Sequence, residues 1–146
     1  MAAILLPDNS CANDGLPVLS SGVCTLGQAC TVLNSLCFDY ALRFRVMAHV
    51  DFTHTSRVAS PPPLALQRIQ VQPTLSGKGV ERLPLAEREE MFQSLWETEE
   101  SVVKAYGLAA SDFQHVLDSF PVFARKRPAF HRFLRERLAE WKAEEG

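Results

Sequence analysis

Positively charged side chains are concentrated in one stretch of the sequence, where they could bind phosphate groups. Residues 123–137 contain six bases and one acid, and three of the bases, Arg125, Lys126 and Arg127, are adjacent. Such cations neutralise nucleic-acid phosphates and gain free energy from the counterions that are released. Residues 81–101 contain seven acids and two bases, so an acidic segment precedes the basic one. The alternative interpretation is a solvated basic surface that partly pairs with this acidic segment.

The predicted last helix adds further cations to this stretch. A helical period begins at Pro128, a residue that suits the first turn of a helix. Four polar side chains share about a third of the helix circumference: His131, Arg132, Arg135 and Lys142. The apolar stripe expected opposite them consists of Phe130, Leu134, Leu138 and Trp141. We therefore predict that Arg132 and Arg135 contact phosphates together with the three adjacent bases.

Catalytic and cofactor-binding motifs are not recognisable in the sequence. It contains no glycine-rich phosphate-binding motif, no G-x-S-x-G elbow and no H-E-x-x-H zinc motif. Asp51, His54 and Ser56 are too close along one predicted strand to converge as a catalytic triad. Residues 60–63 (SPPP) resemble the S/N/D-P-P-aromatic loop of amino-group methyltransferases, but Pro63 offers no aromatic ring on which a base could stack. The sequence predicts no catalytic residue and no cofactor, and the chain by itself is not expected to be an enzyme, although this stays open.

The cysteines do not show the spacing of a metal site. They stand at Cys11, Cys24, Cys30 and Cys37 without a C-x-x-C pair. Cys30 and Cys37 are one heptad apart in an apolar helical pattern, which favours buried free thiols. A disulfide or a zinc site is the alternative. His49 and His54 do not have the spacing of two ligands on one strand face, and we predict no metal.

The first half of the chain is expected to combine a small sheet with a long helix. Residues 2–6 and 16–19 are short apolar runs separated by turn formers, and they are predicted to be strands. Residues 49–55 alternate in polarity like a half-buried strand. Thr25 and Gln28 form a capping-box pattern that starts the helix. Its expected apolar stripe consists of Ala29, Leu33, Leu36, Tyr40 and Phe44.

The same helix contains a predicted weak point in its middle. Asn34 and Ser35 are expected to bend or split it, because their side chains compete for backbone hydrogen-bond partners.

The second half is expected to be mostly helical, so that residues 1–146 form a single α+β domain. Residues 59–80, with three consecutive prolines and an SGKG turn, are expected to be an extended connector. Helices are predicted at residues 84–106, 112–119 and 128–146. Gly107 ends the first of them, and the capping-box pattern of Ser111 and Gln114 starts the second. The apolar stripe of the first consists of Phe92, Leu95, Trp96, Val102 and Val103.

Length and composition are those of an ordinary globular domain. The chain has 146 residues, of which 47% are hydrophobic and 22% charged, and its net charge is −2. The apolar runs are too short to span a bilayer. The N-terminus lacks the basic and apolar regions of a signal peptide. We therefore expect a cytoplasmic protein that has no contact with a membrane.

Two segments resemble a known family. Residues 33–52 (LNSLCFDYALRFRVMAHVDF) and 105–126 (AYGLAASDFQHVLDSFPVFARK) are similar to the C-terminal part of type IIG-like restriction-modification enzymes of bacteria. These enzymes are adenine-specific DNA methyltransferases whose target-recognition region follows the methylase domain. The second segment matches the family pattern at Tyr106, Gly107, Leu108, Asp112, Leu117, Asp118, Phe120, Pro121 and Lys126.

The resemblance implies a DNA target-recognition function for the chain. It adds Arg43 and His49 to the residues expected to contact DNA. Before that histidine, Met47 and Ala48 replace the two glycines and one further residue of the family, which makes the loop bulkier. The cofactor and amine-binding motifs of the family lie upstream and are missing, so we expect a separate small subunit, a gene remnant or a fragment. Its expected partners are DNA and a methyltransferase subunit; the alternative is a protein-interaction or scaffold module that has lost DNA binding.

Overall fold

The computed structural model of the chain describes residues 23–44, 58–71 and 83–145. In these ranges the regular elements are all helices, which hold 76% of the residues. They are α1 (Leu26–Asn34), α2 (Leu36–Arg43), α4 (Pro63–Leu66), α5 (Leu85–Ala105), α6 (Ala110–Asp118), α7 (Pro121–Lys126) and α8 (Pro128–Glu145). The predicted α+β class with an N-terminal sheet is therefore wrong.

This correction has a physical reason: in the described ranges, helices cover the apolar core. The apolar faces of the helices pack on one another, and in the described ranges no strand takes part in covering them. The segments that were predicted to form the sheet, residues 2–6, 16–19 and 49–55, lie outside the described residues.

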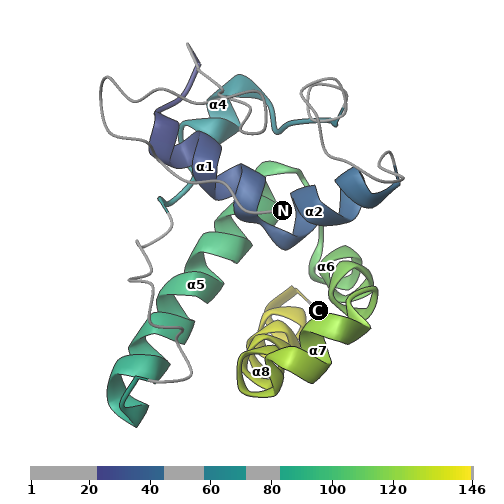
Figure 1. Ribbon diagram of the computed structural model, residues 1–146. Helices are drawn as coiled ribbons and strands as arrows, with labels where there is room; N and C mark the ends of the chain where they lie inside the picture. The colour runs from purple at the N-terminus through teal and green to yellow at the C-terminus, as the bar shows by residue number, and fades with distance from the viewer. Residues whose placement is uncertain (1–22, 45–57, 72–82, 146) are drawn as a thin grey trace, which may run out of the picture.

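The helices form two groups that are joined by the long helix α5. Figure 1 shows α1, α2 and α4 at one end of the molecule and α6, α7 and α8 at the other. Helix α5 runs past both groups and contacts α1, α2 and α8. The second group is held together by packing of α6 and of α7 against α8. Helix α2 contacts α6 directly, so the two groups also meet without α5.

The predicted helix start at Thr25 and the predicted break at Ser35 are both confirmed. The Thr25 hydroxyl accepts the backbone N–H of Gln28 at 3.2 Å, and the Gln28 side chain accepts the N–H of Thr25 at 3.1 Å. Ser35 ends α1 and caps α2: its hydroxyl donates to the carbonyl of Val32 at 2.7 Å and accepts the N–H of Phe38 at 3.2 Å. The sequence thus makes two short helices instead of one long helix.

The break also changes which residues of α1 and α2 are buried. The buried residues are Thr31, Val32, Cys37, Phe38 and Leu42, whereas Phe44 is 75% exposed. The stripe predicted from Ala29 to Phe44 is therefore right only in part: Leu33, Leu36 and Tyr40 pack against the core, but Phe44 does not, because the prediction assumed a single continuous helical register. Each helix instead turns its own face toward the core after the change of direction at Ser35.

Helix α5 ends as the sequence predicts. Gly107 has φ +70°, a conformation that costs glycine little because it lacks a Cβ. The N–H groups of Gly107 and Leu108 donate to the carbonyls of Lys104 and Val103 at 3.0 and 3.2 Å. This pair of bonds is a Schellman motif, which satisfies the last carbonyls of the helix.

Helix α6 begins earlier than Ser111 and Gln114 predict. It starts at Ala110, and the carboxylate of Asp112 accepts the N–H of Ala109 at 2.9 Å. Asp112 thus provides the side chain that caps the start of α6, in place of Gln114. Its negative charge also suits the positive end of a helix. The predicted capping box at Ser111 is wrong, because that residue already lies within the first turn.

In the described residues the core consists of two apolar clusters that both include residues from the end of α5. Consecutive residues Val102 and Val103 are fully buried, and they belong to different clusters. The larger cluster joins α5, α6 and α8 and includes Trp96, Phe113, Leu117, Leu134, Leu138 and Trp141. The smaller joins α1, α2 and the proline-rich segment through Val32, Phe38, Leu42, Val58 and Ile69. The predicted apolar stripes of α5 and α8 are thereby confirmed.

The proline-rich segment is packed where the structure describes it. We expected residues 59–80 to be extended, but Pro63–Leu66 form a helical turn, and Pro61 and Ile69 are buried. The side-chain amide of Gln28 donates to the carbonyls of Gln67 and Ile69 at 2.9 and 3.3 Å. These bonds hold residues 67–69 against α1.

Candidate nucleic-acid interface

The three adjacent bases belong to a helix end and not to a turn. Arg125 and Lys126 are in the last turn of α7, and Arg127 caps it. Cations at this end of a helix interact favourably with the helix dipole. The N–H of Arg127 donates to the carbonyl of Phe123 at 2.8 Å, and its own carbonyl accepts the N–H of His131 at 2.9 Å. The chain therefore passes from α7 into α8 without a loop.

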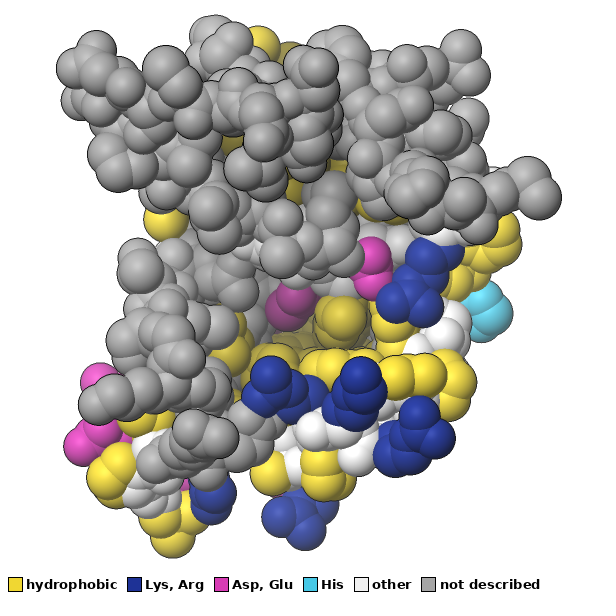
Figure 2. Space-filling view, in the orientation of Figure 1, with side chains coloured by type: hydrophobic (Ala, Val, Ile, Leu, Met, Phe, Trp, Pro, Cys, Tyr) yellow, Lys and Arg dark blue, Asp and Glu magenta, His cyan; other side chains and the backbone are white. Residues whose placement is uncertain are grey.

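Aromatic packing fixes the angle between these two helices. The ring of Phe123 is 5.9 Å from that of Phe130 and 5.8 Å from that of His131, both nearly edge to face. We call the end of α7 and the first two turns of α8, residues 125–135, the α7–α8 corner. Figure 2 shows Lys and Arg side chains gathered over the region where α7 and α8 lie in Figure 1.

The cations of the α7–α8 corner differ in what they contact. Arg125, Lys126 and Arg132 are exposed. None of the three forms an ion pair with an acid in the described part of the chain. Arg135 instead forms an ion pair with Asp118 of α6, and both side chains are about half exposed. Burial raises the pKa of Asp118, but the hydrogen bonds from Arg135 and Gln114, together with the charges of Arg135 and His131, outweigh it and bring the pKa below its ordinary value.

The polar side of α8 lies beside α6 and does not face open solvent as a whole. Lys142 donates to the side chain of Gln114, and Arg135 contacts Asp118, so both side chains bridge the two helices. Burial and the neighbouring Arg135 lower the pKa of His131, while Asp118 acts against them. Arg132, Arg135 and Lys142 are exposed, as expected for a face away from the buried stripe, and part of this face flanks the contact between α6 and α8.

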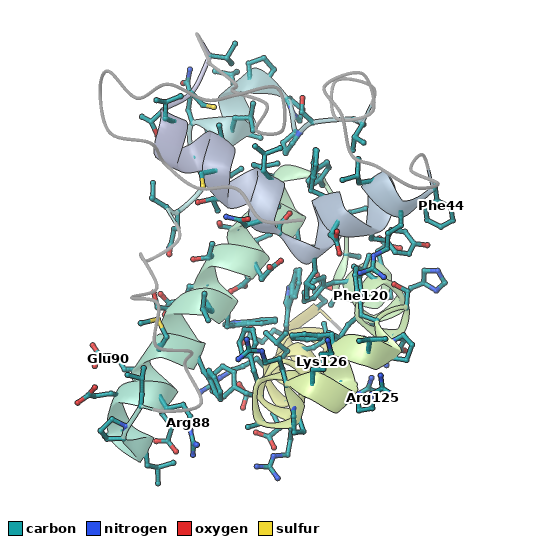
Figure 3. All side chains as sticks on the ribbon, viewed as in Figure 1. Phe44, Arg88, Glu90, Phe120, Arg125 and Lys126 are labelled. Carbon is teal, nitrogen blue, oxygen red and sulfur yellow. The ribbon has the colours of Figure 1, made fainter. Side chains whose placement is uncertain are left out.

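Arg43 lies apart from the α7–α8 corner and has partners of its own. Its guanidinium donates to the carboxylate of Asp39 at 2.9 Å and lies 4.2 Å from the ring centroid of Phe120. Figure 3 shows Phe120 between the end of α2, marked by Phe44, and α7 with its labelled residues Arg125 and Lys126. His49, the other residue implied by the resemblance, lies outside the described residues.

Sequence reasoning missed a group of titratable side chains around the start of α2. Both carboxylate oxygens of Glu99 are 3.2 Å from the backbone nitrogen of Leu36. Burial raises the pKa of Glu99 to about 8, although the bond from Leu36 acts against it. Burial, and then the charge of Glu99, raise the pKa of Cys37. No sequence signal reveals this group, because Glu99 and Leu36 are 63 residues apart.

Other kinds of site find no support in the described ranges. Among residues 23–44, 58–71 and 83–145, no group of three His, Cys, Asp or Glu side chains could hold a metal ion. Over the same ranges, no helix combines the length and the apolar character needed to cross a membrane. None of Cys24, Cys30 and Cys37 forms a disulfide, and Cys11 is outside the described residues.

No protein-family model matches the sequence, and neither the curated proteins nor the solved structures contain a match. The resemblance to restriction-modification enzymes therefore stays a prediction. A proposal for the function of the chain therefore rests on the geometry of the described residues.

Proposed function

We propose that the chain is a non-catalytic DNA-associated module that contacts phosphates through the α7–α8 corner. The observation that carries this proposal is a contrast between two groups of cations. Arg43, Lys104, Arg135 and Arg137 each form an ion pair with a carboxylate. Arg125, Lys126 and Arg132 are exposed without an acidic partner among the described residues.

A phosphate backbone fits these cations for an electrostatic reason. Like charges at one corner repel each other, and an anionic strand relieves this repulsion while it releases counterions. The helix dipole explains the favourable placement of Arg125 and Lys126 at the end of α7. It does not explain Arg132, which is in the second turn of α8 near its positive end. We therefore expect sequence-independent contacts with phosphates and no reading of base edges.

The biological setting of this proposal comes from the resemblance at residues 33–52 and 105–126. It is a bacterial restriction-modification system in the cytoplasm, where a methyltransferase subunit supplies the catalytic domain. The chain would then act as the C-terminal specificity region or as a remnant of one.

A protein-interaction module is the second candidate, and one observation favours it. Four large apolar side chains are about half exposed or more around α1 and α4: Val23, Leu26, Leu64 and Val71. Val71 also lies against Gly27, since a Cβ on that glycine would be 3.0 Å from its side chain. An exposed apolar surface of this kind is typical of docking sites. This apolar surface would bind a partner protein without involving the α7–α8 corner.

Fluorescence anisotropy with a labelled random-sequence duplex tests the proposal. We expect the Arg125→Ala/Lys126→Ala/Arg132→Ala variant to bind at least tenfold more weakly than the wild type at low salt, because every phosphate that is no longer neutralised weakens binding. The matched control replaces three cations that have acidic partners and is Arg43→Ala/Lys104→Ala/Arg137→Ala. This variant should keep most of the affinity for the duplex. Equal losses of affinity in the two variants would mean that net charge alone drives the binding, and the proposed corner would be wrong.

A further inference from the structure

Glu99 connects α5 to the point where α1 ends and α2 begins. Its carboxylate is 3.2 Å from the backbone nitrogen of Leu36, the first residue of α2. That N–H group has no partner inside its own helix, because the first N–H groups of a helix never do. The next residue inward is Cys37, which is buried in the larger core cluster. Glu99 therefore caps α2 from another helix, directly beside the break at Ser35.

The side chain is held there without a compensating positive charge. A carboxylate at a helix N-terminus is stabilised by the helix dipole, but removing the charge from water costs more unless a cation pairs with it. In the described part of the chain, no lysine, arginine or histidine forms an ion pair with Glu99. Burial accordingly favours the protonated carboxyl group at this position.

The ionisable groups on the surrounding helices do not supply such a charge. Helix α1 has no charged residue, and its titratable group is Cys30. On α2, Cys37 faces Glu99, while Asp39 and Arg43 pair with each other. On α5, Lys104 pairs with Glu100, and Tyr106 at the helix end donates its hydroxyl to the carbonyl of Ala59. The α8 cations Arg135, Arg137 and Lys142 contact Asp118, Glu140 and Gln114.

We propose that Glu99 is a proton-dependent latch between α5 and the break joining α1 to α2. With the carboxyl group protonated, α1 and α2 stay packed against α5. When the proton is lost to solvent, the buried charge favours an open state in which α2 separates from α5 and the carboxylate becomes hydrated.

Opening of this latch would affect the contacts between the two groups of helices. Helix α2 is joined to α6 by the hydrogen bond of 3.1 Å between the Tyr40 hydroxyl and Nε2 of His115. It is joined to the start of α7 by the stacking of Arg43 on Phe120. The Tyr40–His115 bond is exposed and opposes the separation only weakly. The buried side chains Cys37, Phe38 and Leu42 oppose it more strongly, so the open state stays a minor population even when Glu99 is charged. The latch thus controls how firmly the first group of helices is attached to the rest.

Amide hydrogen exchange of the intact chain between about pH 5 and about pH 8 tests the latch. Protection factors corrected for the intrinsic exchange rates give the opening equilibrium of each amide. In α2 we expect opening to increase up to about tenfold per pH unit in this range, the slope for release of one proton. These amides should also be less protected than those of α6 and α8, because α2 opens before the whole domain unfolds.

Two variants complete the test. Glu99→Gln keeps an oxygen that can accept the Leu36 N–H but has no charge, so α2 should show no pH dependence. Glu89→Gln, which removes an exposed acid on the same helix, should behave like the wild type. The proposal is wrong if wild-type α2 opens equally at all pH values, or if its amides exchange only together with those of α8. The wild-type measurement decides this even if Glu99→Gln fails to fold.

Discussion

The guanidinium of Arg43 lies over the ring of Phe120 at 4.2 Å, and this contact joins the end of α2 to the start of α7. Arg43 was expected to contact DNA, because the resemblance places it at an equivalent position. In the structure its two neighbours are instead the carboxylate of Asp39 and the face of a buried aromatic ring. An arginine held in this way contributes to packing between helices.

Replacing Arg43 with alanine should therefore change stability and leave DNA binding nearly unaltered. The expected decrease in the free energy of unfolding is about 1 kcal/mol, from a partly exposed cation–π contact and one i,i+4 ion pair. Urea denaturation measures it, with Arg125→Ala as the control that should hardly change stability. A variant that is as stable as the wild type but binds DNA less well would assign Arg43 to the interface.

The caps of the helices give a second prediction. Ser35→Ala should lower the free energy of unfolding by about 1–2 kcal/mol, because it leaves the N–H of Phe38 without its buried acceptor. Ser111→Ala, inside the first turn of α6, should cost less than about 0.5 kcal/mol. Equal decreases in stability at the two positions would show that Ser111 also acts as a cap, as the sequence pattern had indicated.

Glu99 gives stability a pH dependence whose sign follows from its raised pKa. The folded protein holds this proton up to about pH 8, whereas an unfolded chain releases it near the ordinary value for glutamate, about 4.3. The folded state therefore binds more protons between these values, and stability must fall as the pH rises through this window. The expected fall is on the order of 2 kcal/mol, less than the full pKa difference implies, because Glu99 as a residue is only half-buried although its carboxylate lies against Leu36.

Urea denaturation at several pH values measures this fall. Glu99→Gln should remove most of it and should be more stable than the wild type near pH 8. A wild-type stability that rises steadily from about pH 5 to about pH 8 would contradict a raised pKa at Glu99.

Sequence patterns predicted correctly those features that depend on residues close together along the chain. The capping box of Thr25 and Gln28 and the helix stop at Gly107 involve bonds across three to five residues. The pattern at Ser111 failed because Asp112, one residue further on, provides a stronger acceptor for the N–H of Ala109. Where two local signals overlap, the sequence does not show which of them prevails.

Features that depend on distant residues could not be predicted in this way. The stripe expected along α1 and α2 needed a continuous register, which the change of direction at Ser35 removes. Of the predicted phosphate-binding residues, Arg125, Lys126 and Arg132 are exposed, but Arg43 and Arg135 have acidic partners. The pairing of Arg135 with Asp118 depends on how α6 packs against α8, and that packing has no signature in the sequence.

The central proposal, that the α7–α8 corner binds phosphates, is tested most directly by the salt dependence of DNA binding. For the wild type we expect weak affinity, on the order of 10⁻⁴–10⁻⁶ M near physiological salt, and a steep decrease as salt is added. In the Arg125→Ala/Lys126→Ala/Arg132→Ala variant, the slope of log affinity against log salt should become shallower by about 0.9 for each phosphate that is no longer neutralised. A wild-type protein that does not bind duplex DNA even at low salt, or a variant with an unchanged slope, would contradict the account.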